Sequence, residues 1–350
     1  MTSPLALTRD QILAFRRRAG ALDERLPFGP ESLRRAAWAG LQDSMPRAAV
    51  LSLHARVEGI GPMAWEDPAF VQVWGPRYQI YVVPAADMAV FTVGRWPDTD
   101  KAVARAQTAA ERLRRFLDGE AMGYDDAGEA LDVHPGSLRY ATTTGTVAIR
   151  WDGARRPLVW TVPRPDVDPR AAQLELARRY LHVSGPTTPA AFAKWAGISK
   201  RSGSAAFTGL GGELTAVRTP LGAAAILAAD EPGFRADPGP PAPARLLPSG
   251  DAFTLLHGDD RALLVPDAAR RLELWTPRVW PGAVLVDGEV RGVWRRAHDI
   301  VSIETWGKLP RTALDAVEAE AAGLPIPGAD AIVVRFSHLN GTVTEPGSRR

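Results

Sequence analysis

Three consecutive polar residues near the start of the chain could carry out chemistry. Gln42, Asp43 and Ser44 follow an apolar stretch, residues 36–41, and precede Pro46, which can open a helix. In an extended segment residues i and i+2 face the same side, so Gln42 and Ser44 should point together. The ordinary interpretation is helix capping, in which Ser44 or Asp43 caps the helix from Pro46 and Gln42 is solvated. Both interpretations are open from the residues alone.

The rest of the sequence lacks the usual enzyme signatures. It has no phosphate-binding Gly-x-x-x-x-Gly-Lys-Ser/Thr loop, no His-Glu-x-x-His pair and no Gly-x-Ser-x-Gly motif. Cysteine is absent, which excludes disulfides and thiolate metal sites. The six histidines show no ligand spacing, so we expect each to be structural or solvated, and we expect neither a metal nor a cofactor. They are His54, His134, His182, His257, His298 and His338.

Arginine-rich stretches are the second chemical feature. The chain has 42 basic and 40 acidic residues, a net charge of +2, but residues 170–218 hold seven basic and two acidic ones. A guanidinium is a planar fork that suits phosphates. The same arginines could be the solvated face of a protein from a GC-rich genome. If they bind phosphate, the residues we expect to do so are Arg47, Arg150, Arg155, Arg156, Arg178, Arg179, Lys200 and Arg201.

The elements that must position these residues indicate a repeated unit. Thr8 can cap a helix, Pro30 and Pro46 can open two more, and strand-like stretches then follow to about residue 93. Residues 101–162 and 170–227 repeat the order of three helices and two strands. Asp152-Gly153 predicts a hairpin turn in the second unit. This order is typical of a winged helix.

The sequence therefore predicts an α+β fold of three tandem winged helix-turn-helix modules followed by a small β-rich C-terminal domain. The expected boundaries are 1–97, 98–165 and 166–232 for the modules, 233–250 for a proline-rich linker and 251–350 for the last domain. Asp287-Gly288 predicts a hairpin turn there. The expected strands are residues 253–256, 262–265, 283–286, 290–294 and 332–336.

Length and hydropathy exclude some classes of protein. A chain of 350 residues suits two to four small modules. No apolar run approaches the roughly 20 residues of a membrane helix. The N-terminus shows no basic region followed by an apolar stretch, so we expect no secretory signal. We expect a cytoplasmic monomer that contacts no membrane.

A helix-turn-helix array with arginine-rich faces is typical of nucleic-acid binding. The second helix enters the major groove, the wing contacts the flanking backbone, and Arg and Lys on phosphates supply non-specific affinity. Winged helices also serve as protein-interaction modules, so a scaffold without nucleic acid is an open alternative. Duplex binding with a steep salt dependence would separate the two.

The chain resembles the AlkZ-like DNA glycosylases, a family of tandem winged-helix proteins related to the YcaQ branch. The block from Gly40 to Arg47, with the helix behind it to Val57, is similar to the family's Gly-Leu-Gln-x-(Gln/Asp/Glu)-x-Pro block. Similar stretches follow in family order at 181–197, 246–251 and 284–294, so the resemblance spans about residues 7–300. Ser44 departs from the family's Gln or carboxylate, and residues 74–79 depart from an Arg-Gly-Thr-Leu-His-like stretch.

The resemblance implies a concave surface for double-stranded DNA and the metal-free, monofunctional excision of N-alkylated or cross-linked bases. A purine alkylated at N7 is already cationic, so the enzyme must mainly position a water and stabilise an oxocarbenium ion. The role carried over to Gln42 is to hold and polarise that water through its amide carbonyl, with Ser44 or Asp43 orienting it. Because serine is a poor base, a catalytically silent DNA-binding or regulatory protein is the alternative.

Overall fold

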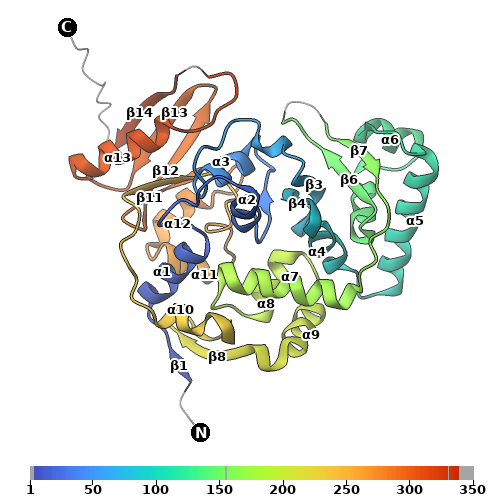
Figure 1. Cartoon of the computed structure of the whole chain (residues 1–350), viewed down its shortest axis with the longest axis horizontal. Helices are drawn as coiled ribbons and strands as arrows, with labels where there is room; N and C mark the ends of the chain where they lie inside the picture. The colour runs from blue at the N-terminus through green and yellow to red at the C-terminus, as the bar shows by residue number, and fades with distance from the viewer. Residues whose placement is uncertain (1–3, 154–155, 330, 339–350) are drawn as a thin grey trace.

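Three β-sheets and the helices around them make up the protein (Figure 1). The computed structural model describes residues 4–153, 156–329 and 331–338. The sheets have strand orders β2-β4-β3-β6-β7-β5, β10-β11-β12-β13-β14 and β1-β8-β9. The fold is therefore α+β, as expected from the sequence.

The N-terminal segment holds four α-helices and four strands, and it carries the Gln42 region. Thr8 caps the first helix through a reciprocal capping box with Gln11, and Pro30 begins the second. The helices are α1 (Arg9–Ala19), α2 (Pro30–Ala36), α3 (Ala48–His54) and the short α4 (Met88–Thr92). The strands are β1 (Leu5–Ala6), β2 (Leu41–Gln42), β3 (Phe70–Trp74) and β4 (Ile80–Pro84), and the 3-10 turns η2 (Pro76–Tyr78) and η4 (Val93–Arg95) follow β3 and α4.

The next segment follows the predicted order of helices and strands, with a short extra strand. Strand β6 of this segment pairs with β3 of the N-terminal segment through Ile149 and Gln72. The β6–β7 hairpin therefore continues the sheet of the N-terminal segment. The elements are α5 (Asp100–Leu117), β5 (Met122–Gly123), α6 (Tyr124–Ala130), η5 (Pro135–Thr144), β6 (Val147–Arg150) and β7 (Leu158–Thr161). The predicted hairpin is present, because β6 and β7 pair antiparallel and Asp152-Gly153 lies in the connection between them.

The third segment also follows the predicted order, and side chains of Asp168, Thr188 and Ser199 cap its three helices. Its elements are α7 (Pro169–Ser184), α8 (Pro189–Ala196), α9 (Lys200–Leu210), β8 (Leu214–Thr219) and β9 (Gly222–Leu227). In Figure 1, α7 crosses the middle of the molecule, with α8 and α9 beside it.

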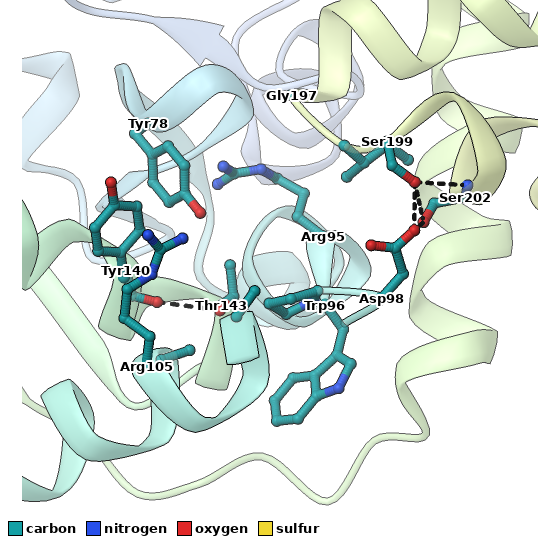
Figure 2. Close-up of a pocket in the computed structure, with 14 residues that line it drawn as sticks. Tyr78, Arg95, Trp96, Asp98, Arg105, Tyr140, Thr143, Gly197, Ser199 and Ser202 are labelled. Atoms are coloured by element: carbon teal, nitrogen blue, oxygen red, sulfur yellow. Dashed lines mark hydrogen bonds between the residues drawn. The ribbon is translucent and has the colours of Figure 1, made fainter. Parts of the chain in front are cut away.

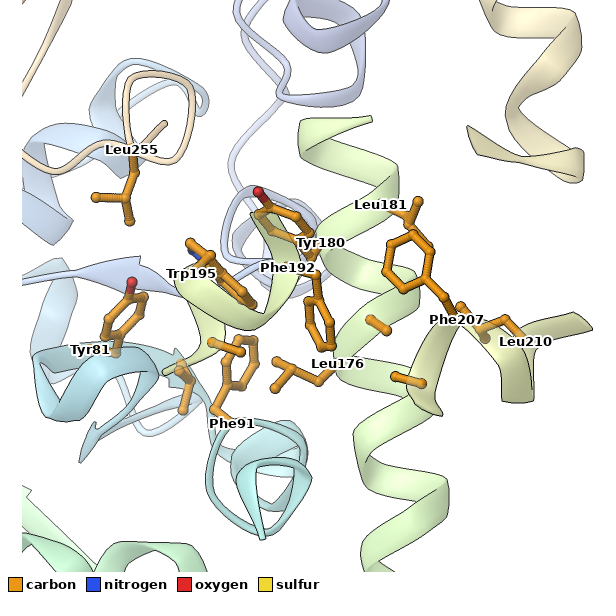
Figure 3. Close-up of a cluster of buried hydrophobic side chains, with 14 of the residues drawn as sticks. Tyr81, Phe91, Leu176, Tyr180, Leu181, Phe192, Trp195, Phe207, Leu210 and Leu255 are labelled. Carbon is orange, nitrogen blue, oxygen red and sulfur yellow. The ribbon is translucent and has the colours of Figure 1, made fainter. Parts of the chain in front are cut away.

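Aromatic side chains join the first and third segments into one core (Figure 3). Tyr81 and Phe91 pack in this cluster with residues of α7, α8 and α9. Tyr180 and Trp195 stack with ring centroids 4.7 Å apart. The sheet that carries Gln42 is thereby fixed against the third segment.

The C-terminal part is a five-stranded sheet with helices, and it begins earlier than expected. Residues 244–247, predicted as part of the linker, form β10, an edge strand of this sheet that pairs with β11. The predicted strands at 253–256 and 262–265 were wrong, because the first is a turn and the second lies largely in helix α11. The hairpin turn at Asp287-Gly288 is confirmed, with positive φ at both residues. The elements are α10 (Glu231–Arg235), β10 (Ala244–Leu247), α11 (Asp260–Leu264), α12 (Ala268–Leu274), β11 (Gly282–Val286), β12 (Glu289–Ala297), β13 (Ile300–Thr305), α13 (Arg311–Ala322) and β14 (Val333–His338).

Candidate active site and nucleic-acid interface

The Gln42 segment is extended, and its side chains alternate between two faces. Gln42 pairs with Tyr81 of β4, and the Asp43 amide donates to the carbonyl of Ile80 at 2.8 Å. Gln42 and Ser44 both bond to the connection between β3 and β4, whereas Asp43 bonds to α3 and to Gln72. The period of two thus places Gln42 and Ser44 on one side, as predicted.

The Gln42 side chain is half-buried and held by an arginine. Arg77 donates from Nη2 to the Gln42 carbonyl Oε1 at 3.1 Å. On the other side lies Gly250, where a Cβ would come within 2.9 Å of the amide nitrogen of Gln42 and φ is +77°. Only glycine fits both constraints. The amide is therefore fixed between an arginine and a backbone.

The Arg77 guanidinium has a second hydrogen-bond partner, His257, which helps to fix its orientation. Its Nη1 lies 3.2 Å from Nε2 of His257. Burial, followed by the charge of Arg77, lowers the pKa of His257 to about 4. Because a guanidinium can only donate and His257 is neutral near pH 7, its Nε2 accepts from Arg77. Arg77 and His257 were missed in the sequence, where the only signal was the departure of residues 74–79 from the family pattern.

A buried ion pair fixes the position of Gly250. Asp251 is fully buried and accepts from both Nη atoms of Arg56, at 2.7 and 2.8 Å, and from the Ser52 hydroxyl at 2.7 Å. Breaking such a pair leaves an uncompensated buried charge. Because Ser52 lies in α3 and Arg56 just after it, the C-terminal part is anchored to the helix behind the Gln42 segment.

Ser44 is bonded to a side chain other than Gln42. Its hydroxyl donates to Oε1 of Gln79 at 3.0 Å. Immediately beyond Ser44, Met45 and Pro46 line a cavity of about 210 Å³ whose lining also includes Trp280 and Trp294. The structure thus brings Gln42 and Ser44 to one face, beside a partly aromatic cavity.

Asp43 faces away from this side, which corrects its assignment as an orienting catalytic residue. Its Oδ1 accepts from the Ala49 amide at 3.0 Å, its Oδ2 accepts from Gln72 at 3.1 Å, and the side chain is fully buried. Burial raises its pKa to about 7. Asp43 therefore caps the first turn of α3, as the capping interpretation proposed for it, although Ser44 makes no such bond and Gln42 is half-buried and bonded to Arg77.

Two of the expected DNA-binding arginines are buried in structural contacts. Arg47 is 8% exposed, lies 3.8 Å over the Trp65 ring and donates to the carbonyls of Trp151 and Asp152. Arg179 is 3% exposed and pairs with Asp87 and Glu175, both at 2.9 Å. The guanidinium groups of both residues are engaged by these structural partners, which argues against the predicted role in phosphate binding. Asp87 comes from the N-terminal segment, far from Arg179 in the sequence, whereas Glu175 lies one turn earlier on α7.

The exposed candidates differ in how firmly they are paired. Arg178 bonds Glu213 at 2.6 Å and also Glu175, while Arg156 lies 3.1 Å from Asp125 and Arg150 pairs with Glu66. Exposed pairs of this kind are weak and can exchange for a phosphate. Arg201 pairs with Asp98 at 3.2 Å. Among the described residues Lys200 is exposed without an ion-pair partner, and Arg155 lies outside the described residues.

Within the described ranges, no group of three or more His, Asp or Glu side chains is arranged to hold a metal ion. In the same ranges no helix is both long and apolar enough to span a bilayer.

The fold and site define the class of this protein. The structure is similar to the DNA glycosylase AlkZ of Streptomyces sahachiroi, with a TM-score of 0.76 and 18% sequence identity over 95% of this chain and 100% of that one. At this identity the likeness concerns the fold, which is that of an AlkZ-type glycosylase. No curated protein matches the sequence.

The family follows from the sequence itself. The family described as DNA glycosylase AlkZ-like matches residues 35–325. The chain therefore belongs to the AlkZ-like DNA glycosylases, DNA-binding repair hydrolases that act on N-glycosyl bonds. The resemblance noted in the sequence is confirmed.

Proposed function

We propose that the protein is a monofunctional DNA glycosylase that hydrolyses the N-glycosidic bond of N7-alkylated purines or cross-linked nucleotides without a metal. The observation that carries the proposal is the Gln42 amide, fixed by Arg77 on a face shared with Ser44 and next to a cavity. In this proposal the three helix-and-hairpin segments are winged helices that hold double-stranded DNA, and the protein acts as a monomer.

The reaction breaks the bond between C1′ and the base nitrogen, and its electron pair leaves with the base. Because an N7-alkylated purine is cationic, this electron pair neutralises the leaving group without prior protonation. Water then bonds to C1′ and loses a proton to solvent. The Gln42 carbonyl retains a lone pair beside the one that accepts from Arg77, so it can accept from the attacking water and orient it.

Ser44 has a supporting role in this scheme. Its hydroxyl donates to Gln79, so its oxygen keeps lone pairs that can accept from the same water. Serine is a weak base, so we assign to it orientation and not proton abstraction. The cavity beyond Met45 and Pro46, with its tryptophans, is the place we propose for an extruded base.

A catalytically silent DNA-binding protein is the second candidate. The observation that favours it is the orientation of Asp43, which turns the carboxylate nearest to Gln42 in sequence toward α3. The family resemblance implies Gln or a carboxylate at the position of Ser44. With serine there and Asp43 turned away, the Gln42–Ser44 motif supplies no general base on this face.

An excision assay separates the two candidates. The purified full chain is incubated with a duplex that holds one N7-methylguanine, and abasic sites are revealed by alkaline strand cleavage. We expect cleavage at the lesion in wild type and a strong loss in Gln42→Ala. Binding of the duplex without any abasic site in wild type would favour the silent protein. Absence of binding would overturn both.

A further inference from the structure

A cavity lies where the three N-terminal segments meet, and its lining includes arginine side chains whose positive charge no carboxylate in the lining neutralises. The cavity, of about 140 Å³, includes Tyr78 of the β3–β4 connection in its lining (Figure 2). Each segment contributes to its lining. Its lining includes Tyr78, Arg95, Asp98, Arg105, Tyr140 and Ser199.

Arg95 is a buried cation without a carboxylate partner among the described residues. It is 3% exposed, and its Nε and Nη1 donate to the carbonyls of Ala196 and Trp74, both at 2.9 Å. Burial lowers its pKa to about 10, so it stays charged at neutral pH. Buried charges are normally paired. In the part of the chain that the structure covers, its Nη2 makes no hydrogen bond.

A second cation lies at the same end of the cavity. Arg105 of α5 is exposed, lies 3.6 Å from the centre of the Tyr140 ring, and forms no ion pair with any described residue. Tyr78 lies between the two arginines, under Arg95 at 4.6 Å and edge-on to Tyr140 at 5.4 Å. The aromatic rings hold both guanidinium groups at this end without neutralising them.

The single carboxylate of the lining lies at the opposite end, as Figure 2 shows. Asp98 accepts from the hydroxyls of Ser199 and Ser202 and pairs with Arg201. Its charge is therefore already engaged. An anion entering the cavity would meet Arg95 and Arg105 first and would lie away from Asp98.

We propose that this cavity is a phosphate-binding site, and that its ligand is a backbone phosphate of the bound DNA strand. A phosphate oxygen would accept from the open Nη2 of Arg95 and from Arg105. Lys200, exposed at the start of α9 directly after Ser199, would add to the same positive field. The assignment of the phosphate to DNA rests on the proposed function. The ability of the cavity to bind a phosphate rests on the structure alone.

The test uses an exposed residue, so that folding is not at stake. Full-length wild type and Arg105→Ala are titrated with an undamaged duplex by fluorescence anisotropy over a range of salt concentrations. One lost charged contact should weaken binding about tenfold. It should also lower the slope of log K against log salt by about 0.9. The control is Arg115→Ala on the same helix, an exposed arginine outside the cavity, which should bind like wild type.

A second measurement separates the source of the phosphate. Inorganic phosphate is added to both proteins, and thermal unfolding is followed against sodium chloride of equal ionic strength. One outcome is that phosphate stabilises wild type but not Arg105→Ala, while both proteins bind the duplex equally well. This result would support the phosphate site but would refute DNA as the source of its phosphate. No difference between the proteins in either measurement would overturn the inference. Failure of wild type to bind duplex would instead overturn the proposed function, while the phosphate measurement would still decide the site.

Discussion

Replacing Gln42 by alanine tests the core of the proposed mechanism. The substitution removes the carbonyl that accepts from Arg77 at 3.1 Å and that we expect to accept from the attacking water. Loss of one well-placed polar stabiliser costs about 10²–10³ in rate, or about 2.7–4 kcal/mol of activation free energy. Duplex affinity should barely change, because phosphate contacts supply most of it.

The same substitution has a smaller cost in stability. A hydrogen bond to a charged group contributes about 1.5–3 kcal/mol, and Arg77 keeps its contact with His257. Gln42 is half-buried, so water can reach the guanidinium after truncation. We therefore expect the variant to fold, with a free energy of unfolding lower by less than about 3 kcal/mol.

Single-turnover excision of N7-methylguanine, with enzyme in excess over duplex, measures this loss without interference from product release. The matched control is Gln79→Ala, which removes a second half-buried glutamine, bonded to Ser44 on the same connection as Arg77. Its rate should fall less than about tenfold. Equal rates for wild type and Gln42→Ala would refute the assignment of the water to Gln42.

Substitutions at four positions, Ser44, Asp43, Lys200 and Arg179, test the neighbouring features of the structure. Ser44→Ala should lower excision less than Gln42→Ala, whereas Ser44→Asp, which restores a carboxylate, should raise it by up to about 10² in the same assay; a rate unaffected by both would exclude a role for this position. The carboxyl of Asp43 keeps its proton to about pH 7 in the folded state but loses it near 3.8 when unfolded, so wild type should lose stability relative to Asp43→Asn as pH rises from about 4 to about 7. Denaturant titrations across that range check this, and parallel stability curves would contradict the burial argument. Lys200→Glu should weaken duplex binding and flatten its salt slope by at least about 0.9, whereas Arg179→Ala should mainly lower the free energy of unfolding, by about 3–5 kcal/mol, and leave the slope unchanged. The reverse pattern would mean that Arg179 is a phosphate contact.

Local patterns in the sequence predicted the local structure well. The alternation of Gln42, Asp43 and Ser44 depends only on an extended backbone, and the predicted cap at Thr8 depends on a residue three positions away. The positive φ values at Asp287-Gly288 likewise belong to one tight turn. Such features need no information from the rest of the chain.

Pairing over long distances could not be read from the sequence. Three basic residues on helices look alike in the sequence, namely Arg178, Arg179 and Lys200. In the structure Glu213 pairs with Arg178 and Asp87 pairs with Arg179, whereas Lys200 has no ion-pair partner among the described residues. Arg56 and Asp251 lie 195 residues apart, and neither position stands out in composition. The proline-rich residues before it favoured a linker at β10, although its residues pair with β11 at the edge of the C-terminal sheet.

The four stretches that resemble the family converge on one place in the structure. Gly197, from the stretch at 181–197, packs against the Arg77 backbone so closely that a Cβ would lie 2.8 Å from it, just as Gly250 packs against Gln42.

The stretch at 284–294 supports the one at 246–251, because Leu246 pairs with Val284 and the Trp294 indole donates to the Leu247 carbonyl at 2.9 Å. Helix α3 closes this arrangement: its first turn is capped by Asp43, and Ser52 within it helps to bind Asp251. The geometry at Gln42 is thus a property of the N-terminal, third and C-terminal segments together. A substitution in any of them that moves Gly197, Gly250 or Arg77 acts on the same amide.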